Sequence, residues 1–315
     1  MLMITGGSGF IGRHLCARLA RDGVPFRAAL RSLRSAPDGV TAFAVGEIDG
    51  DTQWRPALEG ARTVIHIAGL AHGAGGGSAA ELLRVNVAGT ASLARAAAQS
   101  GVSRFVLLST AKVHGDEIPR GVAITEDAPL APADPYAASK LDAENALRTI
   151  SQETGMECTV VRTPLVYGAG VKANFLALLT AVSRGWPLPF GNVDNRRSLV
   201  YAGNLVDALL TCASHPAAAG QAFLVSDGIA VSTAALVREI GSALGRAPRL
   251  VPVPPPLLRL GGTLAGRRAA IDRLLGSFAV DDARIRQRLN WQPPIARAEA
   301  MSATAAWFLA LDRTS

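Results

Sequence analysis

Cysteine is scarce in this chain of 315 residues: Cys16, Cys158 and Cys212 lie far apart and are odd in number. This pattern argues against a disulfide framework and favours reduced thiols in the cytoplasm. Long apolar runs are also missing, since the most apolar late stretches carry Pro, Gly and Arg and fall short of the ~20 apolar residues of a membrane helix. The opening MLMIT leads straight into a glycine-rich turn, so we expect no export signal. A cytoplasmic protein without an integral membrane segment is predicted, with residues 252–266 as a candidate contact surface for a membrane or a partner.

Basic runs with interleaved aromatic residues are absent as well. The formal net charge is +7, but the arginines are spread along the chain rather than massed in one segment. Nucleic acid is therefore not an expected partner, and no metal is expected either. Anionic small molecules remain attractive ligands, and a hydrophobic fraction of 49% fits a globular protein with a substantial core.

Short apolar runs alternate with helix-patterned segments in the first half of the chain. Strand-like runs include MLMIT, TVIHIAG, RFVLLST and ECTVVRT, and helix-like segments span residues 10–23, 80–101 and 136–155. Such alternation predicts an α/β fold, a Rossmann-type doubly wound parallel sheet with helices on both faces. After about residue 165 the alternation weakens and Pro-rich joints appear. We expect residues 1–165 to form the dinucleotide-binding domain and residues 166–315 a smaller substrate lobe, with some segments returning to the sheet.

TGGSGFIG, residues 5–12, follows the first expected strand and opens the first expected helix. It spaces Gly6, Gly9 and Gly12 as G-x-x-G-x-x-G. Glycines there permit the turn, let backbone N–H groups approach a pyrophosphate and leave the helix N-terminus facing the negative charge. We therefore predict a dinucleotide site at these glycines.

The end of the second expected strand decides which nicotinamide cofactor is preferred. NAD enzymes usually place an acidic residue there for the ribose 2′-OH, whereas this chain has Arg31, Ser32 and Arg34. Two arginines suit a 2′-phosphate, so NADP(H) is favoured and NAD(H) stays open. The alternative interpretation is an ordinary pair of solvated arginines.

DPYAASK, residues 134–140, places one of only three tyrosines four residues before one of only three lysines. On a helix, Tyr136 and Lys140 would be neighbours on one face. Lys140 can lower the pKa of the phenol from ~10 and bind the nicotinamide ribose, while Tyr136 gives or takes the proton of an alcohol or carbonyl. This pair predicts hydride chemistry balanced by a tyrosine proton.

Together these motifs resemble an extended short-chain dehydrogenase/reductase of the nucleotide-sugar epimerase/dehydratase group. The resemblance covers essentially the whole chain, and its further motifs are VIHIAG (64–69), NVAGT (86–90), STAKVHG (109–115), RTPLVYGAG (162–170) and RRSLVYAGNLVDAL (196–209). It implies a catalytic role for Thr110, four positions before His114, which stands where the family has the tyrosine of V-Y-G. His114 would tune the sugar pocket or form a structural hydrogen bond.

The resemblance also implies ligand contacts elsewhere in the chain. Besides the glycines, the arginines and the Tyr136–Lys140 pair, the cofactor contacts would be Phe10, Ile11, Ile48, Ala68, Gly69, Asn86 and Thr163. Contacts to a UDP-sugar would be Ser109, Thr110, His114, Asn174, Phe190, Arg197 and Arg273. The guanidinium of Arg197 suits a diphosphate and Arg273 is a weaker candidate for the same anion, while both remain open as plain surface residues.

Departures from the family pattern discriminate among its reactions. The 4,6-dehydratases have an Asp-Glu pair directly after the catalytic threonine, whereas Ala111 and Lys112 follow Thr110, so dehydration is not expected. STAKVHG, LPFGNVDNRRSLVYAGNLVDAL and RRAAIDRLLGSFAVDD resemble most the branch that reduces UDP-4-keto-6-deoxy-N-acetylhexosamines in surface-polysaccharide synthesis. The expected product is a UDP-6-deoxy sugar, such as UDP-N-acetylquinovosamine or UDP-N-acetylfucosamine.

Two alternatives stay open. A UDP-sugar C4-epimerase uses the same residues but retains NAD, and a non-catalytic NADP-sensing regulator would share the fold without needing the Tyr136–Lys140 pair. The sequence leaves open the face of hydride attack and whether the protein is a homodimer.

Overall fold

The computed structural model describes residues 1–36, 40–71, 77–119, 121–266 and 268–312. Its main sheet has seven parallel strands in the order β3-β2-β1-β4-β5-β6-β9. The strands are β1 (Leu2–Thr5), β2 (Phe26–Leu30), β3 (Thr41–Ala44), β4 (Thr63–His66), β5 (Arg104–Thr110), β6 (Glu157–Thr163) and β9 (Ala222–Leu224). The prediction of a Rossmann-type doubly wound parallel sheet is confirmed.

The strands are apolar on both sides because helices cover both faces of the sheet. All seven residues of β5 are buried. Within β1, Met3 packs into one core and Ile4 into the other, as the alternation of side chains along a strand requires.

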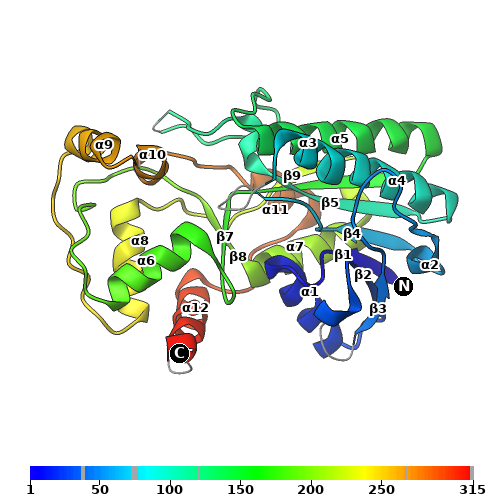
Figure 1. The fold of residues 1–315 in the computed structure, drawn as a ribbon, viewed down its shortest axis with the longest axis horizontal. Helices are drawn as coiled ribbons and strands as arrows, with labels where there is room; N and C mark the ends of the chain where they lie inside the picture. Colours follow the sequence, from blue (N-terminus) through cyan, green and yellow to red (C-terminus); the bar gives the residue numbers. More distant parts are fainter. Residues whose placement is uncertain (37–39, 72–76, 120, 267, 313–315) are drawn as a thin grey trace.

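Two helical layers sandwich the sheet (Figure 1). One face is covered by α1 (Phe10–Arg21), α7 (Ala202–Ser214) and α11 (Ala283–Leu289), the other by α2 (Arg55–Leu58), α4 (Gly89–Gln99) and α5 (Pro135–Thr154). α3 (Ala79–Leu82) continues through a π-helical turn at Leu83–Ala88 into α4. Short 3₁₀ turns lie at Leu33–Ser35, Ala111–His114 and Pro216–Ala218.

A second body of structure lies beside the sheet, on the left of Figure 1. Strands β7 (Leu165–Tyr167) and β8 (Leu199–Tyr201) pair there in a two-stranded parallel sheet. A separate core gathers α6 (Ala173–Ser183), α8 (Thr233–Ala243), α9 (Pro255–Leu264), α10 (Arg268–Leu275) and α12 (Arg297–Asp312). The chain enters this body after β6 but returns to the main sheet for α7, β9 and α11.

In the part of the chain that the structure describes, no helix has the length and apolar character to cross a membrane. All three cysteines are buried and free of disulfides.

Candidate functional site

The predicted glycine turn lies where the strand order reverses, between β1 and β4. Gly6 has φ +75°, a conformation that favours glycine. A Cβ atom on Gly12 would lie 2.0 Å from the carbonyl oxygen of Gly6, so a side chain there would fill the turn. Gly9 caps α1 without any side-chain hydrogen bond, which leaves the N–H groups of the first turn available to an anion. This cradle fits the pyrophosphate of a dinucleotide.

The turn after β4 closes the other side of this cradle. A Cβ atom on Gly6 would lie 2.7 Å from the backbone nitrogen of Ala68, so the two turns touch backbone to backbone. A Cβ atom on Gly69 would lie 2.9 Å from Oδ1 of Asn86 and 4.0 Å from Nζ of Lys140. The predicted cofactor residues Gly6, Ala68, Gly69, Asn86 and Lys140 are thus brought together.

A buried chain of hydrogen bonds runs under this cradle. The ring nitrogens of His66 lie 2.6 Å from the Thr5 hydroxyl and 3.0 Å from the Thr90 hydroxyl. The Thr90 hydroxyl donates to the carbonyl oxygen of Asn86, and Nδ2 of Asn86 donates to Oγ of Ser139, one residue before Lys140. Asn86 lies in the π-helical turn, a distortion often found at functional sites. His66 belongs to VIHIAG, but nothing in the sequence indicated that it connects to α5.

Beyond the pyrophosphate cradle lie the residues predicted to choose the cofactor. Arg31, Ser32 and Arg34 are exposed directly after β2. Nη1 of Arg31 lies 3.4 Å from Oε1 of Glu47, which follows β3. Ile48 touches the start of α4, where a Cβ atom on Gly89 would lie 2.5 Å from its Cγ2. Glu47 was not predicted, because only the pairing of β2 with β3 brings it beside Arg31.

Tyr136, Lys140 and Thr110 meet at the carboxyl end of β5. Thr110 is the last residue of β5, and its side chain is hydrogen-bonded to the phenol of Tyr136. Tyr136 and Lys140 lie in the first two turns of α5, whose N-cap Asp134 accepts a hydrogen bond from the Ala137 N–H at 2.7 Å. Thr110 and Tyr136 can therefore contact one substrate oxygen, while Lys140 points to Gly69 on the cofactor side.

The local environment shifts the pKa of both residues of the pair. Burial raises the pKa of Tyr136 to about 12, assisted by the charge of Asp134 and opposed by the hydrogen bond with Thr110. Burial lowers the pKa of Lys140 to about 8, against the charge of Glu144 one turn further on. At neutral pH the phenol keeps its proton and the lysine is mostly charged. The pKa of Tyr136 is therefore not lowered, although the sequence led us to expect this from Lys140. Burial of the phenol outweighs the other effects.

A buried ion pair supports this site from below. Glu144 and Arg162 are 0% and 2% exposed at their side chains, with Nη2 of Arg162 2.7 Å from Oε2 of Glu144. The Ser109 hydroxyl donates to Oε1 of Glu144 at 2.6 Å. Nε2 of His114 lies 3.0 Å from Nη1 of Arg162, and its Nδ1 faces the carbonyl oxygens of Ala128 and Pro129. The side chains of Ser109 and His114 are therefore engaged within the protein, and a substrate contact by either would require exchanging these bonds.

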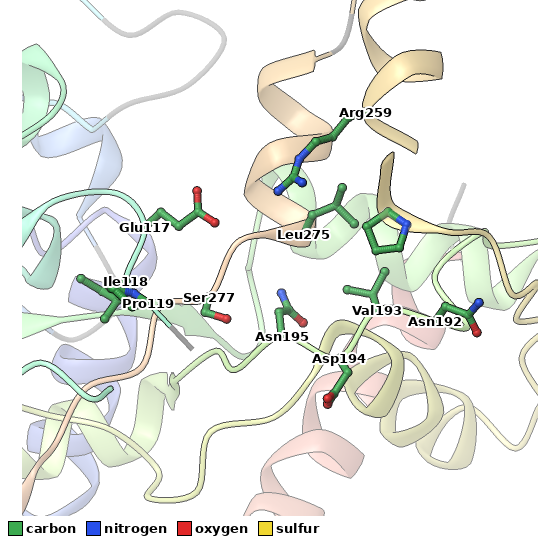
Figure 2. A pocket seen from close by; sticks show the side chains of 11 residues that line it. Glu117, Ile118, Pro119, Asn192, Val193, Asp194, Asn195, Arg259, Leu275 and Ser277 are labelled. Atoms are coloured by element: carbon green, nitrogen blue, oxygen red, sulfur yellow. The ribbon is translucent and has the colours of Figure 1, made fainter. Parts of the chain in front are cut away.

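Arg197 lies in the second body, two residues after Asn195, and Asn195 lines a cavity of about 570 Å³ (Figure 2). Nη1 of Arg197 donates to the carbonyl oxygens of Arg273 and Gly276, so the chain brings Arg197 and Arg273 together through backbone. Burial lowers the pKa of Arg197, opposed by the charge of Glu117. Asn195, which lines the cavity, also donates to Gly276 O, at 2.8 Å. Glu117, Asp194 and Asn195 were not predicted, because loops and helices far apart in sequence form this cavity.

The remaining predicted contacts are dispersed. Phe190 is 5% exposed and packs in the core of the second body, whereas Asn174 is exposed at the start of α6. The side chain of Arg273 is exposed on α10. Thr163 ends β6 opposite Thr110, and Phe10 and Ile11 open α1.

Among the described residues, no group of three or more His, Cys, Asp or Glu side chains is arranged to hold a metal ion.

Known proteins with similar sequences and folds share this architecture. A family model described as "NAD dependent epimerase/dehydratase family" matches residues 2–226. A UDP-glucose 4-epimerase of Vibrio cholerae is 40% identical over 98% of this chain and 95% of its own length. The solved UDP-glucose 4-epimerase of Thermotoga maritima with UDP-glucose is 21% identical, with a TM-score of 0.77 over 98% of this chain and 99% of that one. MoeE5 in complex with UDP-glucuronic acid and NAD is 24% identical, with a TM-score of 0.79 over 100% and 99%.

Proposed function

Because the chain belongs to the NAD dependent epimerase/dehydratase family, we propose that it is an NADPH-dependent reductase acting on the C4 ketone of a UDP-4-keto-6-deoxy-N-acetylhexosamine. The product is a UDP-6-deoxy sugar, such as UDP-N-acetylquinovosamine or UDP-N-acetylfucosamine, for surface polysaccharide. The nucleotide lies against the second body, where Arg197 contacts the diphosphate, and the sugar extends to Thr110 and Tyr136.

Each residue at the end of β5 has a distinct role. The bound nicotinamide supplies hydride to C4 of the sugar. The hydroxyl group of Thr110 donates a hydrogen bond to the ketone oxygen. Tyr136 transfers its phenolic proton to the same oxygen as the C–O double bond becomes a single bond. Lys140, cationic and directed at Gly69, binds the nicotinamide ribose and stabilises the tyrosinate left behind. Solvent returns the proton to Tyr136 after each turnover.

The reductase assignment rests on Arg31, which is the first residue after β2. A guanidinium there suits the 2′-phosphate of NADPH and does not accept a hydrogen bond from the 2′-OH of NAD.

A C4-epimerase is the second candidate, favoured by the name of the Vibrio cholerae relative, with 40% identity over almost the whole chain. An epimerase returns its hydride to the sugar, so it shows no net cofactor oxidation. Incubating the purified protein with NADPH and UDP-4-keto-6-deoxy-N-acetylglucosamine, and separately with UDP-glucose and NAD, distinguishes the two. Loss of absorbance at the NADPH band with the keto sugar supports the reductase. Conversion of UDP-glucose to UDP-galactose without net cofactor change would assign the epimerase instead.

A further inference from the structure

Helix α9 has a face with no function in the proposed reaction. Its inner side packs on α10, where a Cβ atom on Gly262 would lie 2.8 Å from Cγ1 of Ile271, and Leu258 is buried beside it. On the opposite side Leu257, Leu260 and Leu264 are 56%, 57% and 82% exposed. Their spacing of three and then four residues aligns them on one outward face.

This exposed face is unusual for a helix at the surface of a globular protein. The outward side of such a helix normally carries charged and polar residues, whereas α9 has only one charged residue, Arg259. Arg259 and Pro255 line the cavity, so the leucine face and the cavity lining are separate surfaces of one helix. Figure 1 places α9 and α10 at the end of the second body, remote from the main sheet.

The sequence around the leucines is predominantly basic. Residues 249–276 contain five arginines and a single acidic residue, Asp272. Arg259 and Arg268 both reach the carboxylate of Asp272, at 3.3 and 3.5 Å, with side chains still 46% and 67% exposed. One carboxylate cannot neutralise five arginines, so this segment of the chain carries a positive surplus.

We propose that α9 is a peripheral membrane contact, with Leu257, Leu260 and Leu264 entering the headgroup region of an anionic phospholipid bilayer. Leucines on one face of a helix flanked by arginines bind such a surface through apolar burial and attraction to lipid phosphates. The positive surplus favours anionic lipid over a second copy of this equally basic chain. Contact through the leucine face keeps the protein peripheral and leaves Arg259 at the cavity.

Co-sedimentation of the full chain with vesicles tests the proposal. Vesicles of phosphatidylcholine with phosphatidylglycerol should bind the protein, and vesicles of phosphatidylcholine alone should bind it much less. Raising NaCl from about 0.1 M to about 0.5 M should weaken binding, because salt screens the attraction of arginines to phosphates. The triple variant Leu257→Ser/Leu260→Ser/Leu264→Ser should lose at least about tenfold in vesicle affinity.

A matched variant separates this face from general surface hydrophobicity. Leu130, Leu309 and Leu311 are also exposed, at 42%, 38% and 44%. Their triple replacement by Ser should leave vesicle binding and reductase turnover at wild-type levels. Absence of binding to phosphatidylglycerol vesicles, or equal binding by both triple variants, would overturn the proposal. A change of oligomeric state in the α9 variant, without vesicle binding, would assign the face to a second copy and overturn it too.

Discussion

Arg31 and Glu47 face each other across the ends of β2 and β3, with Nη1 of Arg31 3.4 Å from Oε1 of Glu47. Both side chains are well exposed, at 75% and 58%, so the pair can open when a ligand arrives. The segment after β3 therefore places a carboxylate beside Arg31, where the sequence has none directly after β2. A 2′-phosphate would compete with Glu47 for the guanidinium.

Replacing Arg31 should change cofactor preference. In Arg31→Ala, the dissociation constant for NADPH should rise by about one to two decades, since a charged hydrogen bond to phosphate contributes about 1.5 to 3 kcal/mol. Binding of NADH should change little. Fluorescence titration of both cofactors measures the two constants, with Arg21→Ala, an exposed arginine at the end of α1, as the control.

Glu47→Gln should act in the opposite direction. Without the competing carboxylate, Arg31 is available to the 2′-phosphate. NADPH should therefore bind the Glu47→Gln variant more tightly than it binds the wild type. Equal affinity of the wild type for NADPH and NADH, unchanged in both variants, would refute the assignment of Arg31.

Removing the phenolic hydroxyl tests the proton transfer. Tyr136→Phe keeps the ring against its neighbours but deletes the group that is hydrogen-bonded to Thr110. Turnover should fall by about two to four decades, with cofactor affinity nearly intact, because the loss is confined to the chemical step. A variant that retained more than about a tenth of wild-type kcat would remove Tyr136 from the mechanism.

The pH dependence of turnover should follow Lys140. Its pKa is lowered to about 8, so the side chain is cationic below that pH and neutral above it. Because the charged form binds the ribose and stabilises the tyrosinate, kcat for reduction should be level near neutrality. It should then decline by about tenfold per pH unit well above pH 8. Lys140→Arg keeps the charge at high pH, so its residual activity should lack this decline. A wild-type profile level to pH 10 would contradict the role of Lys140.

Acid should destabilise the protein partly through His66. Burial, with the charge of Lys140, lowers the pKa of His66 to about 3, while the unfolded chain takes up the proton near pH 6.5. The contribution of the neutral His66 ring to the stability of the fold is therefore fully present above about pH 6.5, and it is lost as the pH falls toward 3. Between pH 6.5 and 5, the wild type should lose about 1 to 2 kcal/mol more unfolding free energy than His66→Gln. Urea unfolding of both proteins at pH 6.5 and pH 5 measures this difference. Equal losses of unfolding free energy in the two proteins would show that His66 does not take up a proton on unfolding.

Local patterns in the sequence were sufficient to predict the sheet and much of the cradle. TGGSGFIG specifies the end of a strand, a turn and the start of a helix within eight residues, and DPYAASK specifies a helix start with Tyr136 and Lys140 on one face. These features depend on near neighbours, so periodicity and glycine spacing reveal them.

Contacts between distant segments could not be predicted in this way. Glu47 reaches Arg31 only through strand pairing, and His66 reaches Asn86 only through the packing of α4 on the sheet. Glu144 is four residues after Lys140, a spacing visible in the sequence, yet its burial with Arg162 depends on β6. The cavity lined by Asn195 and Arg259 is built from loops and helices that no local pattern places together.

The most direct test of the central claim follows the hydride itself. NADPH carrying deuterium at its transferable position is mixed with the protein and UDP-4-keto-6-deoxy-N-acetylglucosamine, and the sugar is then analysed by mass spectrometry and NMR. The reductase account predicts deuterium at C4 of the UDP-6-deoxy sugar, with one NADP⁺ formed for each sugar labelled. A sugar that remains unlabelled and unreduced, with NADPH intact but bound, would contradict it.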